Sequence, residues 1–415
     1  MNVSILIPSR NGREFLEWSY NSIRKNQGYR NVEIIVLDDI SDKDDTWEWC
    51  LKTMSNDASL KAFKNETGER FGISGGYKYL SQFATQEVIC HWHNDMFMTE
   101  GTLDAVEQEL FEDDRVDIGY GDYWTNRKPV SENVVCLTRI EPTIYCDAGV
   151  YPEKIVWKDA PIELEQWDEQ KFLNYLPIAK QLWSGLTEGH FAPFFMFTKQ
   201  YLALGGNDTL NFPKQAREDS DWGFRLALAE FKTIQIPQFV YHFASRGNRR
   251  SKHEAGNYID NPEWEEIEIK SVKNFIRKWQ TFLPLHDAFY KPRKPVRYNT
   301  LFRIKNCHDD LLDILEPWCD FLQCDLDNAR IKLFIEHEQP NTPVDLNSKF
   351  FDVPNTGGII VEIDGLVFGA GEYKHIQYLS QIIEQNEQLG KFELDNLKIT
   401  IDDLTHYEKN LIVCA

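Results

Sequence analysis

The stretch that decides the fold is EVICHWHNDMFM, residues 87–98. It begins as a short apolar run at 88–90 and continues into three polar side chains, His93, Asn94 and Asp95. Short apolar runs of this kind form buried parallel strands, and open α/β sheets bind ligands where such strands end. An imidazole and a carboxylate two residues apart have the chemistry to hold a divalent cation, which in turn would neutralise a diphosphate. The alternative is an ordinary polar loop after a strand.

Apolar runs alternate with helical patterns along the first hundred residues. The continuous apolar runs predict buried strands at 3–7, 32–37 and, more weakly, 60–63. The segments that follow these strands repeat apolar residues with a helical period, at 13–27, 47–54 and 73–84. This order of strand and helix predicts an α/β fold with a doubly wound, mostly parallel sheet and right-handed crossovers.

The composition is that of a folded protein without affinity for polyanions. Of the 415 residues, 42% are hydrophobic, and the formal net charge is −21. This charge argues against a nucleic-acid partner and against attraction to an anionic membrane, since both require a basic surface. It also repels a free nucleotide, so a nucleotide site would need a metal ion or local Lys and Arg residues.

The cysteine pattern is typical of a reducing compartment. The eight cysteines form no CxxC pair and no zinc-binding spacing, so we interpret them as free thiols, several of them buried. No apolar run reaches the roughly 18 residues of a membrane-spanning helix, and the sequence opens directly on a strand pattern. We therefore expect a cytoplasmic protein without a transmembrane segment.

The length allows two or three domains, each large enough for its own core. A helix pattern at 103–110 ends the first series, and a less regular region follows it up to a strand pattern at 233–240. An amphipathic segment at 264–282 then leads into a stretch rich in proline, lysine and arginine, which we interpret as a linker. We expect four units, at residues 1–100, 101–255, 256–300 (helix and linker) and 301–415.

The region after residue 300 has strand and helix signals of its own. Apolar runs at 331–335 and 359–363 predict strands, and the pattern around 376–389 predicts a helix. We expect a separate, small C-terminal α/β or α+β domain that docks the acceptor, a partner or a second copy of the chain in a homo-oligomer. Its Asp325 and Asp327 have the letters of a metal motif, and we interpret them as surface charge at a turn.

Carboxylates recur where the predicted strands end. Asp38 and Asp39 follow the second strand directly, as Asp95 follows the strand at 88–90. A nucleotide site at the carboxyl edge of the sheet needs polar groups in these places. The glycine patterns of a dinucleotide fold and of a P-loop are both absent from the sequence.

A second group of acids begins the helix predicted from residue 217. Glu218, Asp219 and Asp221 fall in its first turn, where acids favour the positive end of the helix dipole. Helix stability and a functional site explain this placement equally well. His242 follows the strand pattern at 233–240, and it is either a site residue or an ordinary strand-end histidine.

The order of these motifs resembles the inverting, metal-dependent nucleotide-sugar glycosyltransferases of family 2, which have the GT-A fold. The similar segments lie within about residues 1–250. They are VSILIPSRNG at 3–12, IIVLDDISDKDDT at 34–46, GISGGYKYLSQFATQEVICHWHND at 72–95, LGGND at 204–208, and RED at 217–219 followed by Arg225. The resemblance implies that residues 1–100 bind the nucleotide-sugar donor and that residues 101–255 form the acceptor and catalytic half.

On the donor side, the resemblance assigns a role to each strand end. Asp39 would accept a hydrogen bond from the nucleotide base, and Ser9 and Arg10 would lie against the nucleoside. Asp95 would be the metal-binding acid of the Asp-x-Asp motif, and His242 resembles the family's late metal- or diphosphate-contacting histidine. The cation would stabilise the departing diphosphate.

On the acceptor side, the resemblance makes Asp219 the general base, which removes the hydroxyl proton as the acceptor oxygen attacks the anomeric carbon. Glu218 and Arg225 would orient the acceptor or support the base. Trp222 would stack on a sugar face, with burial in the helix packing as its alternative. Asp221 has the same chemistry as Asp219, and only the motif alignment favours Asp219.

The sequence departs from the family pattern at two places in the donor half. His93 stands where the family has the first acid of Asp-x-Asp. As a direct ligand an imidazole prefers Mn²⁺ to Mg²⁺, and the alternative for His93 is contact with the donor ribose, beside Asn94. Tyr77 and Lys78 replace an Arg-Asn pair, and Lys78 would serve a phosphate as a point charge without a bidentate fork.

The sequence therefore predicts a metal-dependent inverting glycosyltransferase. It would move a sugar from a UDP- or GDP-sugar donor to a hydroxyl of a glycan acceptor, in a setting such as the synthesis of a cell-surface polysaccharide. The alternative, favoured by His93, Tyr77 and Lys78, is a catalytically degenerate GT-A protein that binds nucleotide or carbohydrate without turnover.

Overall fold

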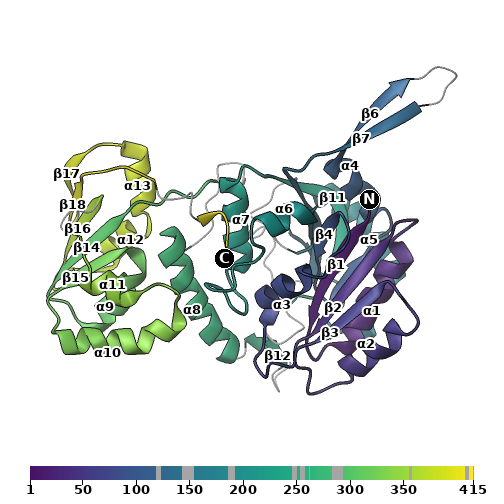
Figure 1. The fold of residues 1–415 in the computed structure, drawn as a ribbon, viewed down its shortest axis with the longest axis horizontal. Helices are drawn as coiled ribbons and strands as arrows, with labels where there is room; N and C mark the ends of the chain where they lie inside the picture. Colours follow the sequence, from purple (N-terminus) through teal and green to yellow (C-terminus); the bar gives the residue numbers. More distant parts are fainter. Residues whose placement is uncertain are drawn as a thin grey trace.

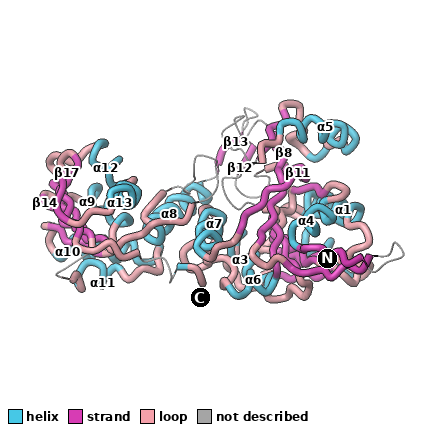
Figure 2. The backbone as a smooth tube through the Cα atoms, turned by 90° about the horizontal axis from the view of Figure 1, so that it is seen from above, coloured by secondary structure: helices cyan, strands magenta, loops and turns pink. Residues whose placement is uncertain are grey.

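The chain forms two sheet-containing parts with helix α8 (Pro262–Trp279) between them. The computed structural model describes residues 1–117, 123–142, 154–185, 192–244, 250–252, 258–260, 262–282, 293–354, 358–406 and 411–414. Figure 1 shows the N-terminal part in purple to teal and the C-terminal part in green to yellow. Seen from above in Figure 2, the two parts lie at opposite ends of the molecule, with α7 (Glu218–Leu228) and α8 in the middle.

The N-terminal part is built on one large sheet, with strand order β3-β2-β1-β4-β10-β8-β11-β5 and β9 beside β8. Its first four strands are parallel: β1 (Val3–Ser9), β2 (Val32–Asp38), β3 (Leu60–Lys64) and β4 (Val88–His91). β1 and β2 are buried along their whole length, as expected for continuous apolar runs in a parallel sheet covered on both faces.

Helices cover both faces of this sheet. Alternate residues of β1 point to opposite sides, so that Ile5 and Leu6 belong to different core clusters. The Ile5 side packs against α1 (Arg13–Asn26), α2 (Thr46–Met54) and α4 (Thr102–Leu110), and the Leu6 side packs against α3 (Gly72–Ser81), α6 (Thr198–Ala203) and α7. The expected doubly wound, mostly parallel α/β sheet is confirmed.

The other half of the sheet mixes strand directions. β10 (Phe194–Phe197) is antiparallel to both β4 and β8 (Asn133–Pro142). β11 (Lys232–His242) and β9 (Lys154–Trp157) are parallel to β8, and β5 (Met96–Met98) is antiparallel to β11. After β4 the chain therefore crosses the ends of three strands before it pairs as β5 at the far edge.

Smaller elements complete the N-terminal part. The hairpin of β6 (Phe111–Asp117) and β7 (Tyr123–Pro129) projects from the body of the molecule (Figure 1). The described residues of this part also form the short helix η2 (Leu164–Gln166), helix α5 (Glu169–Leu182) and the strand pair of β12 (Arg250–Lys252) and β13 (Tyr258–Asp260).

The C-terminal part has a five-stranded sheet and a core of its own, as expected for a separate α/β or α+β unit. The strand order is β15-β14-β16-β18-β17, and the first three strands are parallel to one another. The strands are β14 (Thr300–Lys305), β15 (Phe321–Cys324), β16 (Ile359–Asp364), β17 (Gly390–Leu394) and β18 (Leu397–Ile401). The helices are α9 (Asp309–Leu315), η3 (Glu316–Trp318), α10 (Asn328–Glu338), η4 (Gln339–Asn341), α11 (Leu346–Phe351), α12 (Ala370–Gln377) and α13 (Leu379–Asn386).

Two expectations for this part are wrong in detail. The apolar run at 331–335 lies in α10 and forms no strand. Asp327 caps that helix by accepting from the backbone N–H groups of Ala329 and Arg330, and Ile331 and Ile335, four residues apart, bury one face of it. The helix expected at 376–389 is two helices, α12 and α13, which meet at Tyr378.

Helix α8 contacts both parts of the molecule. Phe275 and Trp279 pack with Phe212 and Phe224 of the N-terminal part, whereas Ile276 belongs to the C-terminal core. Residues 283–292 of the expected linker lie outside the described residues, and the expected boundaries at residues 100 and 255 stay predictions.

The end of the chain returns to the N-terminal part. The backbone N–H of Cys414 donates to the carbonyl oxygen of Leu204 at 3.2 Å, and Arg225 donates to the carbonyl oxygen of Ile412 at 3.4 Å. The C mark in Figure 1 accordingly lies beside α7, far from the sheet of the C-terminal part.

Candidate functional site

The predicted donor-side residues gather at the carboxyl ends of the parallel strands. Ser9 ends β1, and its hydroxyl accepts a hydrogen bond from the Asn94 side chain, after β4, at 2.9 Å. Gly12 leaves room for this contact, since a Cβ atom there would lie 2.5 Å from the Asn94 amide nitrogen. The turn after β1 thus holds the turn after β4 in place.

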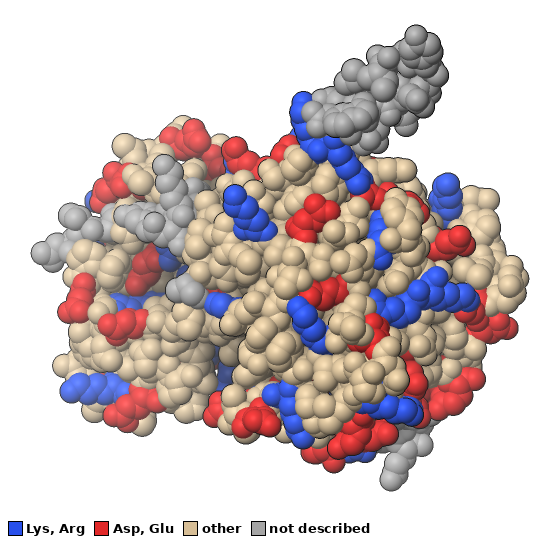
Figure 3. Space-filling view, turned by 45° about the vertical axis from the view of Figure 1, so that its right-hand side comes forward, with Lys and Arg blue, Asp and Glu red and all other residues tan. Residues whose placement is uncertain are grey.

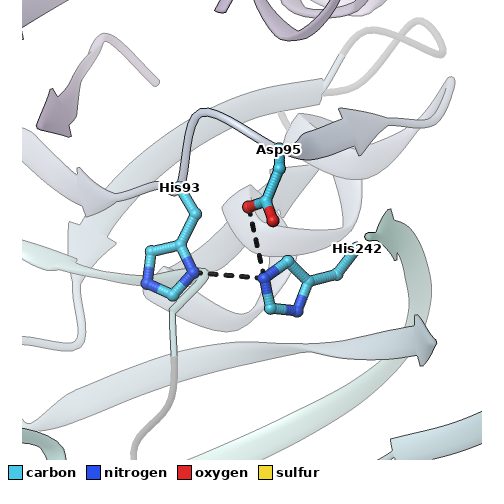
Figure 4. A group of neighbouring side chains, drawn as sticks. All are labelled: His93, Asp95 and His242. Carbon is cyan, nitrogen blue, oxygen red and sulfur yellow. Dashed lines mark hydrogen bonds and ion pairs between the residues drawn. The ribbon is translucent and has the colours of Figure 1, made fainter. Parts of the chain in front are cut away.

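His93, Asp95 and His242 come together where the chain crosses from β4 to β5 (Figure 4). The Nε2 atom of His242 lies 3.3 Å from the Nδ1 atom of His93 and 3.3 Å from a carboxylate oxygen of Asp95. One ligand atom from each of the three residues lies within 4.8 Å of the others. Because ligand atoms on one cation at about 2.2 Å are about 3 Å apart, this arrangement fits a single divalent ion.

The strand register explains this convergence. β5 pairs antiparallel with β11, and Met96 lies opposite His242 in that pairing. Asp95, one residue earlier, therefore meets the end of β11, and its carbonyl oxygen accepts from the backbone N–H of Phe243 at 3.1 Å. His93 lies on the same crossing segment.

The two imidazoles have opposite pKa shifts. Burial, with a further contribution from the nearby His242, lowers the pKa of His93 to about 3, so this ring is neutral and has a lone pair for a cation. Burial alone would lower the pKa of His242 too, but the carboxylates of Asp95 and Glu141 outweigh it and raise that pKa.

Sequence reasoning missed Glu141, which lies on β8 and contacts His242 from the side away from Asp95. The Nδ1 atom of His242 is 2.6 Å from a carboxylate oxygen of Glu141. The only signal in the sequence was a pair of charged residues, Arg139 and Glu141, inside the apolar strand VVCLTRIEP.

Asp39 and Arg10, two further predicted donor residues, bind backbone groups of neighbouring segments. The Asp39 carboxylate is buried and accepts from the backbone N–H groups of Phe71 at 2.9 Å and Gly72 at 2.8 Å, so it fixes the start of α3. Arg10 donates to the carbonyl oxygen of Ile40 at 3.1 Å. Lys78 lies half-buried on α3. Contacts of Asp39, Arg10 and Lys78 with a donor stay predictions.

Tyr77 of α3 packs against the end of β4. Its ring stacks on His91 at the end of β4, with 3.8 Å between the centroids. Burial raises the pKa of its phenol. Its hydroxyl oxygen is buried and has no hydrogen-bond partner within the described part of the chain.

The three acids of α7 have three different environments. Asp221 is fully buried, and its carboxylate contacts Lys278 at 2.6 Å, the Trp279 indole N–H at 2.9 Å and Arg225 at 3.1 Å. Asp219 is half-buried and accepts from the backbone N–H of Ser220 at 2.7 Å. Burial and the neighbouring charge of Asp219 raise the pKa of Glu218, which favours its protonated form.

The backbone before these acids is strained. Ala216 and Arg217 have φ values of +68° and +67°, in the left-handed region that side chains other than glycine rarely adopt. Strain of this kind persists where the surrounding structure requires one backbone geometry, which is common at functional sites. Here it sets the direction in which Glu218 and Asp219 enter α7.

Trp222 and Arg225 lie in the core, so the expectation that they touch an acceptor sugar needs correction. Trp222 is 2% exposed and packs in the cluster that also contains Tyr201. Arg225 is 0% exposed and donates to the carbonyl oxygens of Leu204, at 2.9 Å, and Gly206. Arg225 thus holds the Gly205–Gly206 turn against α7, and Trp222 packs on Tyr201, so both side chains are turned into the core.

The comparisons with known proteins give one family match, which covers the first third of the chain. The model of a family described as glycosyl transferase family 2 matches residues 4–135. This part of the chain is glycosyltransferase family 2-like. The match includes His93 and Asp95 but ends before Asp219 and His242. No curated protein matches the chain.

Solved structures of glycosyltransferases resemble the chain at low sequence identity. The mannosyltransferase PcManGT from Pyrobaculum calidifontis, in complex with GDP-Man and Mn²⁺, is 15% identical over 67% of this chain and 63% of its own, with a TM-score of 0.40. GalNAc-T7 with UDP, GalNAc and Mn²⁺ is 14% identical over 68% and 49%, with a TM-score of 0.43. S. aureus TarS, residues 1–349, is 13% identical over 66% and 72%, with a TM-score of 0.36. The chain thus spans about half to two thirds of the length of the first two proteins.

A second cluster next to the family 2-like part looks like a metal site but is an ion-pair cluster. Asp208, Asp221 and Cys414 place their ligand atoms within 4.8 Å of one another. The ammonium group of Lys278 lies 2.7 Å from Asp208, 2.6 Å from Asp221 and 3.8 Å from the Cys414 sulfur. The lysine therefore already supplies the positive charge that a cation would bring.

One face of the molecule carries side chains of both charges. On the face that Figure 3 shows, basic and acidic side chains are interspersed among neutral ones. Among the helices of the described residues, none is both long and apolar enough to cross a bilayer.

Proposed function

We propose that the chain is a metal-dependent inverting glycosyltransferase that moves a sugar from a nucleotide-sugar donor to a hydroxyl of a glycan acceptor. The observation that carries this proposal is the convergence of His93, Asp95 and His242 at the carboxyl edge of a family 2-like sheet, with ligand atoms within 4.8 Å of one another. Two imidazoles and one carboxylate suit Mn²⁺ better than Mg²⁺, which prefers oxygen ligands.

The donor would bind across the ends of β1, β2 and β4. A cation held by His93, Asp95 and His242 supplies positive charge for the diphosphate that leaves the donor sugar. Ser9, Arg10 and Asn94 lie around the turn next to this centre and would contact the nucleoside. Asp39 would contact the base, and Lys78 would contact a phosphate. The donor would be a UDP- or GDP-sugar.

The acceptor would lie toward the start of α7. Asp219 would take the proton of the acceptor hydroxyl as the oxygen attacks the anomeric carbon, which inverts the configuration there. The structure favours Asp219 over Asp221, because Lys278, Trp279 and Arg225 already occupy the carboxylate of Asp221. Glu218, with its raised pKa, would donate a hydrogen bond to the acceptor.

The setting of this reaction is proposed from the resemblance. Family 2 enzymes build cell-surface polysaccharides among other glycans, and the described cysteines are free thiols, as a cytoplasmic enzyme would have. The C-terminal part would serve an acceptor, a partner or a second copy of the chain.

A binding protein without turnover is the second candidate. It is favoured by His93 in place of the first acid, by Tyr77 in place of an arginine, and by the burial of Trp222 and Arg225 away from any ligand. Such a protein would bind nucleotide in the presence of a metal ion and release no sugar.

Donor hydrolysis tests the two candidates against each other. Purified protein is incubated with a panel of UDP- and GDP-sugars and Mn²⁺, and released nucleoside diphosphate is measured. We expect turnover with at least one donor, its loss after chelation of the metal, and a loss of about 100-fold or more in Asp95→Asn. Asp402→Asn, a change of an exposed acid in the C-terminal part, is the matched control and should keep full activity. Metal-dependent nucleotide binding without turnover for any donor and acceptor would favour the binding protein.

A further inference from the structure

Strand β8 carries two charged residues into the interior of the sheet. Arg139 is 6% exposed and Glu141 is 1% exposed. Burying a charge is costly unless the group is paired and hydrogen-bonded. The contacts of Glu141 therefore indicate what this carboxylate does.

Nitrogen atoms surround the Glu141 carboxylate. One oxygen lies 2.6 Å from the Nδ1 atom of His242 and 3.5 Å from the Nε atom of Arg139, and the other lies 3.3 Å from the ammonium group of Lys154. Arg139 and Lys154 hold the carboxylate from its other sides, so the oxygen nearest to His242 has a fixed position beside the Nδ1 atom.

The strand register produces this arrangement. β11 runs parallel to β8 with Tyr241 opposite Ile140, which brings the next residues of the two strands, His242 and Glu141, together. On the other side of β8, β9 places Lys154 opposite Arg139. Three neighbouring strands thus contribute one residue each to a chain of contacts, in which Glu141 of β8 lies between Lys154 of β9 and His242 of β11.

The contact with Glu141 decides which nitrogen of His242 is available to a cation. A neutral imidazole has one N–H, and a carboxylate faces each nitrogen of His242. The contact of Nδ1 with Glu141, at 2.6 Å, is hydrogen-bond length and shorter than the 3.3 Å contact of Nε2 with Asp95, so the proton belongs on Nδ1. With the proton on Nδ1, the lone pair is on Nε2, which is the atom 3.3 Å from both Asp95 and His93. Histidine ligands of protein-bound metals commonly have such a carboxylate behind them, which orients the ring and raises its basicity.

We propose that Glu141 is a positioning residue of the candidate metal centre, which sets the ring orientation and the tautomer of His242 so that Nε2 faces the cation. This inference rests on the proposed function for the presence of the cation. The inference goes beyond the proposed function because it assigns a role to a residue of β8 that would touch neither the donor nor the metal. A purely structural role, as the partner of Arg139 and Lys154, is the competing explanation.

The first experiment measures Mn²⁺ binding by calorimetry, without nucleotide, in wild type and in Glu141→Gln. We expect an affinity about 10- to 100-fold lower in the variant, because a neutral amide supports the ring less well than a carboxylate. Glu33→Gln is the matched control. Glu33 is another buried carboxylate of the same sheet, paired with Lys61 on β3, far along the sheet from β11. Thermal unfolding of both variants shows whether a loss of affinity only follows a loss of stability.

The second experiment needs no metal and reads the tautomer in the wild-type protein. Nitrogen NMR of wild type labelled with ¹⁵N-histidine, at a pH high enough for neutral rings, identifies the protonated nitrogen of His242, with His242→Gln assigning the signal. A proton on Nδ1 supports the proposal, and a proton on Nε2 overturns it. Unchanged Mn²⁺ affinity in a folded Glu141→Gln protein also overturns it. If wild type binds no Mn²⁺, the metal part of the proposed function fails, and the tautomer still decides the role of Glu141.

Discussion

Three carboxylates in one helical turn show how strongly the environment of a residue decides its chemistry. Asp221 is bound by Lys278, Trp279 and Arg225, so replacing it would break the packing around α7. Glu218 has a raised pKa and favours its protonated form. Asp219 is half-buried, and its described hydrogen bonds come from its neighbour Ser220.

These environments predict different effects of isosteric amide substitutions. Asp219→Asn removes the proposed base, and we expect kcat to fall about 100-fold or more. Glu218→Gln replaces a protonated carboxyl with a group that also donates a hydrogen bond, so we expect it to keep most of the activity near neutral pH. Steady-state transfer assays on both variants, with circular dichroism as a check of folding, measure the difference. Equal losses in the two variants would contradict the assignment.

At the scale of elements, residues 411–414 pack against the turn between α6 and α7. Gly205 has a φ of +79°, and a Cβ atom there would lie 2.0 Å from the carbonyl oxygen of Cys414. The returning segment 411–414 also accepts from Arg225. This turn therefore needs glycine both for its backbone conformation and for the contact with the segment.

Gly205→Ala should displace the end of the chain. We expect a lower melting temperature and faster hydrogen exchange at the Cys414 amide, which donates to Leu204 at 3.2 Å. Gly101→Ala is the matched control, since Gly101 has a φ of +77° with no atom within 4 Å of an added Cβ. The free energy of unfolding of this variant should fall by about 1 kcal/mol, which is the cost of a left-handed backbone conformation for alanine. Equal losses of stability in the two variants, with slow hydrogen exchange at the Cys414 amide in both, would show that Gly205 is not needed for the contact with segment 411–414.

At the scale of the whole molecule, α8 joins the two parts by ion pairs as well as by packing. Arg277 contacts Glu316 at 2.5 Å and Glu338 at 2.7 Å on the C-terminal side. Lys278, the next residue, contacts Asp208 and Asp221 on the N-terminal side. Successive residues of one helix thus hold opposite parts of the molecule, so unfolding of the two parts should be coupled.

Acid should weaken both sets of contacts. Burial alone would raise the pKa of Glu316, but Lys349 and Arg277 outweigh it and lower that pKa to about 2. Lys278 outweighs burial in the same way and lowers the pKa of Asp208 to about 2. Because both values lie below the unfolded-state range of about 4, these groups stabilise the fold above that range, and the contribution is lost as the pH falls toward 2.

Urea unfolding followed by tryptophan fluorescence at pH 7, 4 and 3 measures this loss. We expect the free energy of unfolding to fall over that range, and Glu316→Gln to be less stable than wild type at pH 7 but to decline less steeply with acid. A wild type that is as stable at pH 3 as at pH 7, or a variant that declines just as steeply, would contradict this account.

Local patterns in the sequence determined much of the N-terminal fold. Continuous apolar runs and helical periods depend on neighbouring residues only, and β1 to β4 and α1 to α3 formed where they predicted. The same reasoning failed at 331–335, where two isoleucines four residues apart suit a helix as well as a strand. The carboxyl-edge position of Asp39 and Asp95 also followed from the sequence, because the ends of parallel strands share one edge.

Only the tertiary structure decided which of these side chains meet. His93 and His242 are 149 residues apart, and they come together because the chain crosses three strand ends between β4 and β5. Pairing between distant strands also brought Glu141 behind His242, and the packing of α7 against α6 and the turn after it buried Trp222 and Arg225. Burial and contact across a sheet are properties of the packed molecule, because they depend on strand order and register that no local pattern encodes.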